Sequence, residues 1–483
     1  MASLRLVGHQ YIYPVSDILR MFFGVPRQVA EDLLQSGAEL PLFTSRLEAG
    51  RAEAGCAGVR ISTEGAGCCM QAEVLESMAR REIKRQLYHV LAQAAGCSFP
   101  WGSLTGIRPT QVAAECLQRH VDLPAARDEL IEHWYVSAEK ADLALETAAE
   151  EQALLARISQ DSLLVYLGVP FCPSRCAYCS FITQDALHHA NRLEPYVEAM
   201  IREADVFFGS VRKPVSALYL GGGTPTSLPD ALFRRLLTGI LPLIPLTSGA
   251  ELTVEAGRPD TITAEKLGLI RAAGATRLCI NPQTFHDRTL KRIERHHSAV
   301  QTIEAYRLAR AMGFDQINMD LIAGLPGETP ADFADSLRQA IQLEPDSITV
   351  HTLAIKRSSQ LNHDLDSRKD LLSDLRPISG LAAMLAEGKQ LLSSAGLMPY
   401  YLYRQKDVAG GLENTGFARL GKGCLYNVGM MSDRRSVVGL GSGAMSKRVF
   451  GSKLERLPNP RDLGVYIDRV ESLAIRKATF FLE

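Results

Sequence analysis

Two features that many chains carry are missing from this sequence: a secretion signal and a long apolar run. Residues 1–17 contain no basic segment followed by an extended apolar stretch and a small-residue cleavage site. No stretch elsewhere is long and apolar enough to cross a bilayer. We therefore expect a cytoplasmic protein with no membrane span.

Cysteine is also sparse, at 10 of 483 residues, and only three of the cysteines form a compact group in the sequence. In a long chain without an export signal, such a pattern indicates reduced thiols. It favours a metal site over a disulfide framework.

An excess of charge of one sign is lacking too, because the formal net charge is −1. Without a global positive field, nucleic acid is not expected as a partner. Hydrophobic residues make up 46% of the chain and charged residues 22%, which is typical of a globular protein. The length predicts two or three domains of about 150 residues each.

No internal repeat or low-complexity tract divides the chain, so its parts are defined by pattern. Residues 1–137 mix short strand-like runs such as 58–62 with a helical pattern over 74–95. This mixture predicts an N-terminal α+β module, whose role the sequence does not give. Residues 138–158 are rich in Ala, Glu and Leu and contain no Gly or Pro, which predicts a linking helix.

From residue 159 to residue 360, short apolar strands alternate with amphipathic helices. Thr329 and Pro330 suit the N-cap and the first position of one of these helices. Such repetition predicts an α/β fold with a parallel sheet and right-handed crossovers, here a partial (β/α)6 barrel. Ligands then belong at the C-terminal ends of the strands. The expected strands are 163–169, 217–220, 251–255, 276–280, 316–322 and 347–350.

The last part of the chain, residues 361–483, has a different composition. It begins with a helical run at 379–395 and then becomes rich in glycine and aromatic residues. We expect a separate C-terminal α+β domain that serves as a substrate or lid domain.

Cys172, Cys176 and Cys179 form a CxxxCxxC motif directly after the first expected barrel strand. Three thiolates this close can share one cuboidal iron–sulfur cluster, and its fourth iron stays open to chelate a cofactor. The alternatives are three plain loop cysteines, or zinc ligands that lack a fourth partner. Because structural zinc normally takes four protein ligands, the motif favours the cluster.

The second expected strand ends in the glycine run 221–223, which Thr224 and Pro225 follow. Glycines at a strand end let the backbone approach a ligand and present its N–H groups, which suits a carboxylate. A glycine run by itself is more often simply a turn. Its value here is its position, because the second strand end should lie beside the cysteine loop.

Together these blocks resemble the radical S-adenosylmethionine superfamily and, more narrowly, its oxygen-independent coproporphyrinogen III oxidase family. The blocks SLTGIRPTQ (103–111) and LYRQKDVAGGLENTGFA (402–418) are similar to the HemZ-type branch in particular, so the resemblance covers most of the chain. The other blocks that carry it are, in chain order, YLGVPFCPSRCAYCSF, YLGGGTPT, LTVEAGRPD, INPQTFHDRTLKRIERHH, INMDLIAGLPGET and VVGLGSGAMS.

The resemblance implies that the three motif cysteines hold a [4Fe-4S] cluster and that the cofactor is S-adenosylmethionine, in up to two molecules. Read singly, each further residue could be an ordinary strand residue, a paired charge or a capping amide. At strand ends around one cluster, they favour function. A first cofactor molecule would contact Tyr166, Gly222 and Glu255. A second would contact Tyr178, Gly223, Thr224, Gln283, Arg295 and Asp320.

The reaction that the resemblance implies belongs to anaerobic haem biosynthesis. An electron from the reduced cluster cleaves the cofactor to methionine and a 5′-deoxyadenosyl radical, which removes a hydrogen from a propionate of coproporphyrinogen III. Loss of CO2 and one electron leaves a vinyl group, and two rounds give protoporphyrinogen IX. The implied partners are this porphyrinogen and an unidentified reductant protein. Cations that could bind the propionates, by charge alone, are Arg404, Lys406, Lys356 and Arg357.

One position departs from the pattern of the family's oxidases, which carry a further cysteine shortly after the third cluster ligand. This chain has Ser180 and Phe181 there and resembles the haem-chaperone relatives. A haem carrier that oxidises no porphyrinogen is therefore one alternative, and a radical enzyme that opens the haem ring is another. The C-terminal part shows no histidine-containing haem-binding signature. His351, at the sixth strand end, is more simply a structural or substrate-side residue than an iron ligand.

Overall fold

The computed structural model describes residues 3–23, 42–50, 58–65, 67–105, 108–179, 184–354, 378–404, 411–451 and 453–483. The chain divides into two units. The smaller unit holds residues 1–146, 404–406 and 410–412, and the larger unit holds residues 147–403, 407–409 and 413–483. The division falls inside helix α6 (Ala138–Leu155), which lies where the linking helix over 138–158 is expected.

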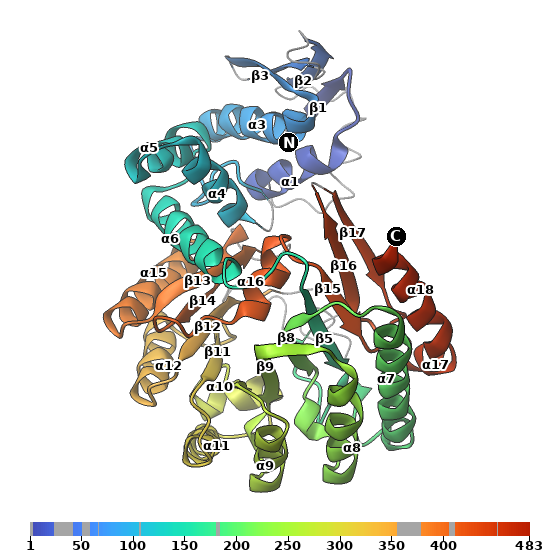
Figure 1. The fold of residues 1–483 in the computed structure, drawn as a ribbon. Coiled ribbons are helices and arrows are strands. Elements are labelled where there is room, and N and C mark those ends of the chain that lie inside the picture. The colour runs from blue at the N-terminus through green and yellow to red at the C-terminus, as the bar shows by residue number, and fades with distance from the viewer. Residues whose placement is uncertain are drawn as a thin grey trace. The chain divides into compact units, whose positions relative to one another are not determined.

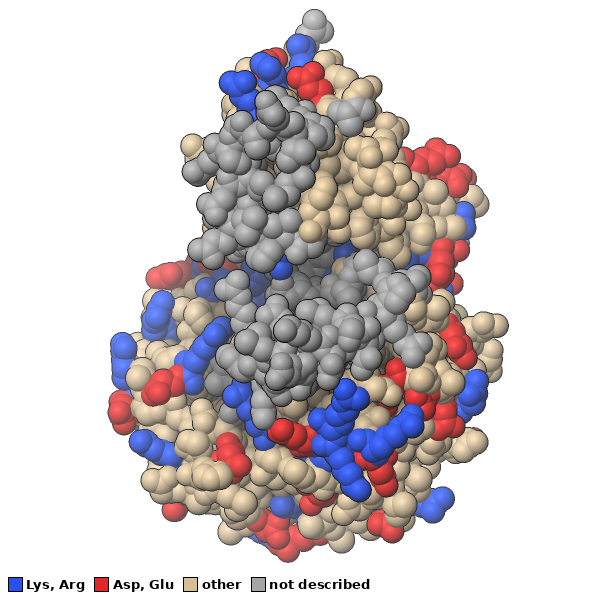
Figure 2. Space-filling view, turned by 180° about the vertical axis from the view of Figure 1, so that it is seen from behind, with Lys and Arg blue, Asp and Glu red and all other residues tan. Residues whose placement is uncertain are grey.

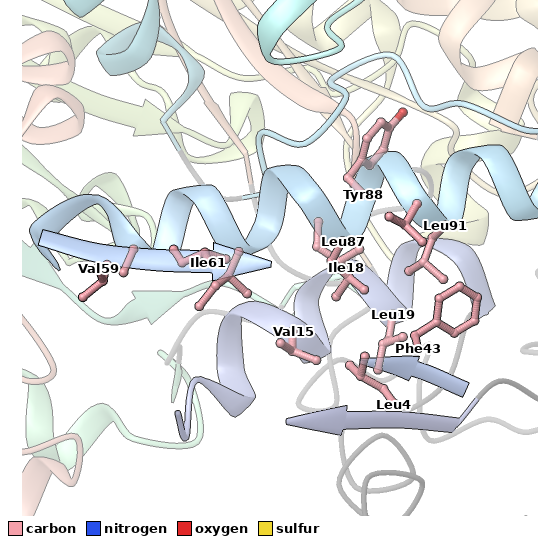
Figure 3. Packing of buried hydrophobic residues seen from close by; sticks show 13 residues of the cluster. Leu4, Val15, Ile18, Leu19, Phe43, Val59, Ile61, Leu87, Tyr88 and Leu91 are labelled. Carbon is pink, nitrogen blue, oxygen red and sulfur yellow. The ribbon is translucent and has the colours of Figure 1, made fainter. Parts of the chain in front are cut away.

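The smaller unit contains a four-stranded sheet in the order β1-β2-β3-β4. β1 lies parallel to β2, and the other two pairs are antiparallel. Apolar side chains of the strands and of two helices form one core, in which Figure 3 shows Leu4, Leu19 and Phe43 packed together. The elements of this core are β1 (Ser3–Val7), α1 (Ile12–Phe23), β2 (Leu42–Ala49), β3 (Gly58–Gly65), β4 (Cys68–Leu75) and α3 (Ala79–Ala95).

The helix expected over 74–95 is shorter than predicted at its N-terminal end. Leu75 belongs to β4, where it pairs with Gly58 of β3, and α3 begins only at Ala79. Leu75 and Met78, two apolar residues within the expected range, are exposed and do not belong to a buried helix face. Pairing with a neighbouring strand outweighs local spacing here, as is common for strand residues.

Short helices complete the smaller unit between α3 and α6. Pro109 is the first residue of α4, a position that its fixed φ and missing N–H suit. Asp122 caps α5 by accepting a hydrogen bond from Ala125 N (2.8 Å). These elements are α4 (Pro109–Arg119), α5 (Leu123–Asp128) and a π-helical turn (Glu129–His133).

The larger unit contains one sheet of eleven described strands, and its centre is a run of six parallel strands. These six are neighbours in chain order, and each overlaps a strand expected from the sequence. Consecutive parallel strands are the arrangement of βα units in a partial barrel, so the predicted α/β fold is confirmed. The six are β5 (Leu163–Val169), β8 (Val215–Gly222), β9 (Leu246–Gly257), β10 (Arg277–Ile280), β11 (Ile317–Ala323) and β12 (Ser347–Thr352).

Helices follow the first five of these strands and lie outside them in an arc (Figure 1). The predicted start of α12 is confirmed, because Asp332 N donates to Thr329 Oγ1 (3.2 Å), Thr329 N donates to Asp332 Oδ2 (2.7 Å), and Pro330 is the first helical residue. The helices are α7 (Ala190–Ser210), α8 (Asp230–Ile240), α9 (Ala264–Ala272), α10 (Asp287–Arg292), α11 (Ala299–Ala311) and α12 (Pro330–Gln342).

The C-terminal part of the chain adds strands to both edges of the parallel run. β14 pairs antiparallel with β12, and β15 pairs in parallel with β5, so neither end strand of the run is a free edge. The role of residues 361–483 as a substrate or lid domain stays a prediction. The elements are α15 (Ile378–Ser394), β13 (Met398–Arg404), β14 (Glu413–Ala418), α16 (Leu425–Ser432), β15 (Val437–Leu440), β16 (Met445–Phe450), β17 (Lys453–Pro458), α17 (Leu463–Asp468) and α18 (Val470–Leu482).

The surface carries charges of both signs. Figure 2 shows basic and acidic side chains interspersed over the coloured part of one face, in keeping with the net charge of −1. Within the ranges that the structure describes, no helix combines the length and the apolar character needed to cross a membrane.

A buried ion pair joins the C-terminal helix to the first helix of the barrel. Lys477 of α18 donates to Glu203 of α7, and neither side chain is exposed to solvent. Glu203 also accepts hydrogen bonds from Tyr466 Oη (2.7 Å), Asn459 Nδ2 (2.8 Å) and Gly441 N (2.8 Å). Burial lowers the pKa of Lys477, and the Glu203 charge opposes that change. The carboxylate is thus fully satisfied, the condition under which a buried pair is tolerated.

Replacing Lys477 with Met should destabilise the larger unit by about 3–5 kcal/mol, because the Glu203 carboxylate would stay buried without its cation. Urea unfolding followed by circular dichroism measures the free energy of unfolding. The matched control is Arg202→Ala, which breaks an exposed pair (2.8 Å) between Arg202 of α7 and Glu471 of α18. It should cost less than about 1 kcal/mol. Equal losses in the two variants would contradict the structural role of the buried pair.

Candidate functional site

The cysteine loop follows the first parallel strand directly. Cys172 ends the short strand β6 (Phe171–Cys172), which pairs in parallel with β7 (Gln184–Asp185). Further along, Cys179 N donates to Cys176 O (3.0 Å) in a tight turn. Cys176 is buried, and the other two cysteines are half-buried. The loop thus holds the three thiols partly or wholly away from solvent at the end of β5.

Backbone hydrogen bonds join the glycine run to this loop. Gly223 N donates to Val169 O (2.7 Å), and Thr224 N donates to Phe171 O (2.7 Å). The Thr224 hydroxyl also donates to Cys172 Sγ (3.5 Å). The prediction that the glycine run lies beside the cysteine loop is confirmed. These two backbone N–H groups bind within the protein, so they differ from the ligand-facing N–H groups that the sequence suggests.

Two of the glycines leave little or no space for a side chain. Gly222 has a φ of +110°, and a Cβ on it would lie 3.1 Å from Tyr166 Oη. A Cβ on Gly223 would lie 2.5 Å from Phe171 O and 3.0 Å from Cys172 Sγ. The glycine run is therefore required by the close approach of two backbone segments, whatever ligand lies beside it.

Glu255 of β9 lies on the other side of the glycine run. A Cβ on Gly221 would be 2.5 Å from its carboxylate, which accepts hydrogen bonds from Asn281 Nδ2 (3.2 Å) and Tyr219 Oη (3.4 Å). Burial raises the pKa of Glu255 to about 8, and the charge of Asp320 acts in the same direction. The Glu255 carboxyl is therefore mostly protonated at neutral pH unless a cation lies close to it.

Three tyrosine rings form a stack beside Glu255. Tyr166 of β5, Tyr219 of β8 and Tyr426 of α16 have ring centroids 4.9 to 6.3 Å apart and interplanar angles of 22° to 29°. Burial raises the pKa of all three phenols, so they remain neutral hydrogen-bond donors. Of the three, only Tyr166 is among the predicted site residues. Tyr219 is its direct partner in the β5–β8 register, which the sequence alone does not specify.

Asp320 of β11 and His351 of β12 form a second polar group. His351 Nε2 lies 3.6 Å from Asp320 Oδ2, and its Nδ1 lies 3.3 Å from Tyr403 Oη. Asn318 Nδ2 donates to Asp320 Oδ1 (2.8 Å). Burial acts to raise the pKa of Asp320, but the contacts with His351 and Asn318 outweigh it and hold that pKa below its usual value. The structure thus places His351 beside a carboxylate, that of Asp320.

Gln283 is placed next to Asp320 by its backbone. Its φ is +70°, its N–H donates to Asp320 O (2.9 Å), and its carbonyl accepts a hydrogen bond from Ile322 N (3.0 Å). A non-glycine residue in this conformation is uncommon and is often found at functional sites. Gln283 is also buried, so two of the predicted residues meet between β10 and β11.

Two arginine side chains reach the cysteine loop. Arg295 Nη1 lies 3.7 Å from Cys176 Sγ and 3.3 Å from Tyr178 Oη, and its Nη2 donates to two backbone carbonyls. Arg258 lies 3.9 Å from the same sulfur and is absent from the predicted set. Its position just after the block LTVEAG, at a strand end, is the signal that could have identified it.

Contacts therefore link the predicted cysteines and cofactor residues into one set, although their roles toward a cofactor stay predictions. The expected substrate cation Arg404 is different. It is buried in the smaller unit, where its guanidinium donates to the carbonyl oxygens of Leu104 and Gly411. The remaining residues singled out in the sequence, which lie outside the described residues, are Ser180, Phe181, Lys356, Arg357 and Lys406.

The donor set around the cysteine loop fits an iron–sulfur cluster. Burial raises the pKa of Cys172 to about 12, so metal binding must displace the thiol proton. Thr224, Arg258 and Arg295 direct hydrogen-bond donors at the cysteine sulfurs, as is usual around cluster thiolates.

Comparison with known proteins supports this assignment. The family described as the Radical SAM superfamily matches residues 166–340. The oxygen-independent coproporphyrinogen-III oxidase-like protein HemZ of Bacillus subtilis is 35% identical over 84% of this chain and 83% of its own length. The heme chaperone HemW of Escherichia coli is 30% identical over 60% of this chain and 71% of its own. The structure of coproporphyrinogen III oxidase (HemN) from Escherichia coli, a radical SAM enzyme, matches with a TM-score of 0.52 and 25% identity over 68% of this chain and 73% of that one.

Valine at Gly222 and at Gly223 should have different effects. At Gly223, the new side chain would collide with Phe171 O and Cys172 Sγ, so we expect loss of iron and sulfide after anaerobic reconstitution. At Gly222, valine would adopt a strained φ at a cost of about 1–3 kcal/mol. We expect this variant to keep the cluster but to stop forming 5′-deoxyadenosine, because Gly222 is a predicted contact of the first cofactor molecule. Cys172→Ala sets the cluster-free reference, and the exposed Cys69→Ala is the control. Full iron content in the Gly223 variant would contradict this account.

Glu255→Gln should remove a pH dependence of stability. The folded protein keeps a proton on Glu255 up to about pH 8, whereas the unfolded chain releases it near the usual value of 4.5. Stability from this group is therefore fully present below the usual pKa and is lost as the pH rises through about 8. Between about pH 5 and pH 8.5, the free energy of unfolding of the cluster-free wild type, measured in urea, should fall by more than about 1 kcal/mol relative to that of the variant. A difference that stays constant with pH would refute the raised pKa.

Proposed function

Because the chain belongs to the radical SAM superfamily and, within it, to the HemZ-type branch of the oxygen-independent coproporphyrinogen III oxidase family, we propose that it converts coproporphyrinogen III to protoporphyrinogen IX. In each of two rounds, a propionate side chain loses a hydrogen atom to the 5′-deoxyadenosyl radical. It then loses CO2 and passes one electron to an acceptor, which leaves a vinyl group.

The extent of the match to the HemZ-type relative carries this proposal. That match spans 423 residues, well beyond residues 166–340 that match the superfamily alone. The match to HemW spans 290 residues. An oxidase-like relative that shares most of both chains supports a shared reaction more strongly than a superfamily domain does, because the superfamily fold hosts many chemistries.

The cluster and S-adenosylmethionine of this superfamily supply the radical chemistry, and this chain's own residues would bind and orient the reactants. Glu255 would give up its proton to accommodate an ammonium group. Hydrogen bonds from Asn281 and Tyr219 would hold the resulting carboxylate. Asp320, whose pKa is held low, would offer a second carboxylate, and the Arg295 guanidinium would attract a carboxylate group.

A haem carrier is the second candidate. The match to HemW, a heme chaperone, favours it. His351 and Tyr403, whose ring nitrogen and phenol oxygen lie 3.3 Å apart, are residues of types that ligate haem iron. Such a carrier would keep the cluster, bind haem tightly and leave coproporphyrinogen unchanged.

The deciding experiment is an anaerobic assay of reconstituted protein with coproporphyrinogen III, a low-potential reductant and S-adenosylmethionine. We expect harderoporphyrinogen and protoporphyrinogen, with about one 5′-deoxyadenosine per vinyl group because each propionate loses one hydrogen atom. Cys172→Ala should give none of these products.

Protein with a full cluster that forms 5′-deoxyadenosine but neither porphyrinogen product would contradict the oxidase proposal. In that case, stoichiometric binding of unchanged haem would support the carrier. Conversion of haem to an open tetrapyrrole would support the ring-opening enzyme.

A further inference from the structure

Arg258 follows β9 and is buried at the cysteine loop, with 3% of its surface exposed. Asp260 holds the guanidinium in two places, because Nε donates to Asp260 Oδ1 (2.8 Å) and Nη2 donates to Asp260 Oδ2 (2.7 Å). A bidentate contact of this kind fixes the plane of the guanidinium as well as its position. The side chain is therefore preorganised, with Nη1 as its remaining terminal nitrogen.

That remaining nitrogen points to the cysteine loop. Arg258 Nη1 donates to Ser174 Oγ (3.1 Å) and lies 3.9 Å from Cys176 Sγ, within hydrogen-bonding range for sulfur. Arg295 Nη1 approaches the same sulfur at 3.7 Å. Cys176 is thus faced by two guanidinium groups, whereas the donor described at Cys172 is the neutral hydroxyl of Thr224.

We propose that Arg258 raises the reduction potential of the cluster by donating to the Cys176 sulfur. One electron from a low-potential one-electron donor adds one negative charge to the cluster, and no bond forms or breaks. An N–H donor at a ligand sulfur stabilises the more negative state, and so does the guanidinium charge, which the Asp260 carboxylate offsets in part.

Arg258 is a better candidate for this role than Arg295. The Arg295 side chain also donates to Tyr178 and to backbone carbonyls, and it is expected to contact a cofactor carboxylate. Its loss would change several things at once. The described side-chain partners of Arg258 are Asp260, Ser174 and Cys176, all on its own turn or on the cysteine loop. The inference rests on the cluster alone and does not depend on which tetrapyrrole the protein binds.

The test is a redox titration of anaerobically reconstituted protein without S-adenosylmethionine or porphyrinogen. Electron paramagnetic resonance measures the amount of reduced cluster at each potential. Arg258→Met removes the cation and its donors. We expect the ratio of reduced to oxidised cluster at fixed potential to fall about tenfold, which is a midpoint about 59 mV lower for one electron. Arg258→Lys keeps a charge but loses the bidentate geometry, and Arg258→Gln keeps an amide donor but loses the charge, so both should shift the midpoint less in the same direction.

The matched control is Arg435→Met. Arg435 is also a buried arginine, but it donates to Leu155 O (2.7 Å) and is not among the donors to the cysteine sulfurs, so its loss should leave the midpoint unchanged. Arg258→Met with full iron and sulfide and an unchanged midpoint would overturn the proposal. If that variant binds no iron, Arg258→Gln decides in the same way. Loss of iron in all three variants would assign Arg258 to holding the loop, which also overturns it.

Discussion

The site depends on the close approach of two backbone segments, where Gly223 N and Thr224 N donate to Val169 O and Phe171 O. This pairing continues the contact between β5 and β8 beyond their last regular residues and fixes where the cysteine loop begins. It is possible because Gly223 has no β-carbon to collide with Phe171 O. Cys172, the next residue, is thereby held against the Thr224 hydroxyl. The glycine run is thus first a structural support for the cluster loop.

Charge is distributed unevenly along the site. Arg258 and Arg295 face the cysteine sulfurs, whereas the carboxyl groups of Glu255 and Asp320 lie across the strands β9 to β11. The two carboxyl groups have pKa values shifted in opposite directions, so at neutral pH one is mostly neutral and the other is charged. Anionic ligand groups are favoured at the arginine end and cationic groups at the carboxyl end. A zwitterionic amino-acid group matches that polarity.

Much of this could be predicted from the sequence because it depends on local patterns. The six strands, the Thr329 cap and the adjacency of the cysteine and glycine loops follow from apolar runs, capping residues and the parallel order of βα units. The stack of Tyr219 on Tyr426 and the contact of Arg258 with Cys176 could not be predicted, because they depend on strand register and on residues distant in the sequence. The late start of α3 does not follow from the sequence, because pairing with β3 overrides helical spacing.

The far C-terminal segment is part of the same structural support. β15 pairs in parallel with β5, with Val437 opposite Leu164, so it covers the edge of the strand that carries Tyr166. The approach is again close, since a Cβ on Gly441 would lie 2.4 Å from Gly168 O. Before β15 is in place, one side of β5 has unpaired backbone groups, and the strand leading into the cysteine loop is an edge strand. During synthesis this pairing forms late, because its two partners are separated by most of the barrel. The final packing of the strand that leads into the cluster loop therefore requires nearly the whole chain.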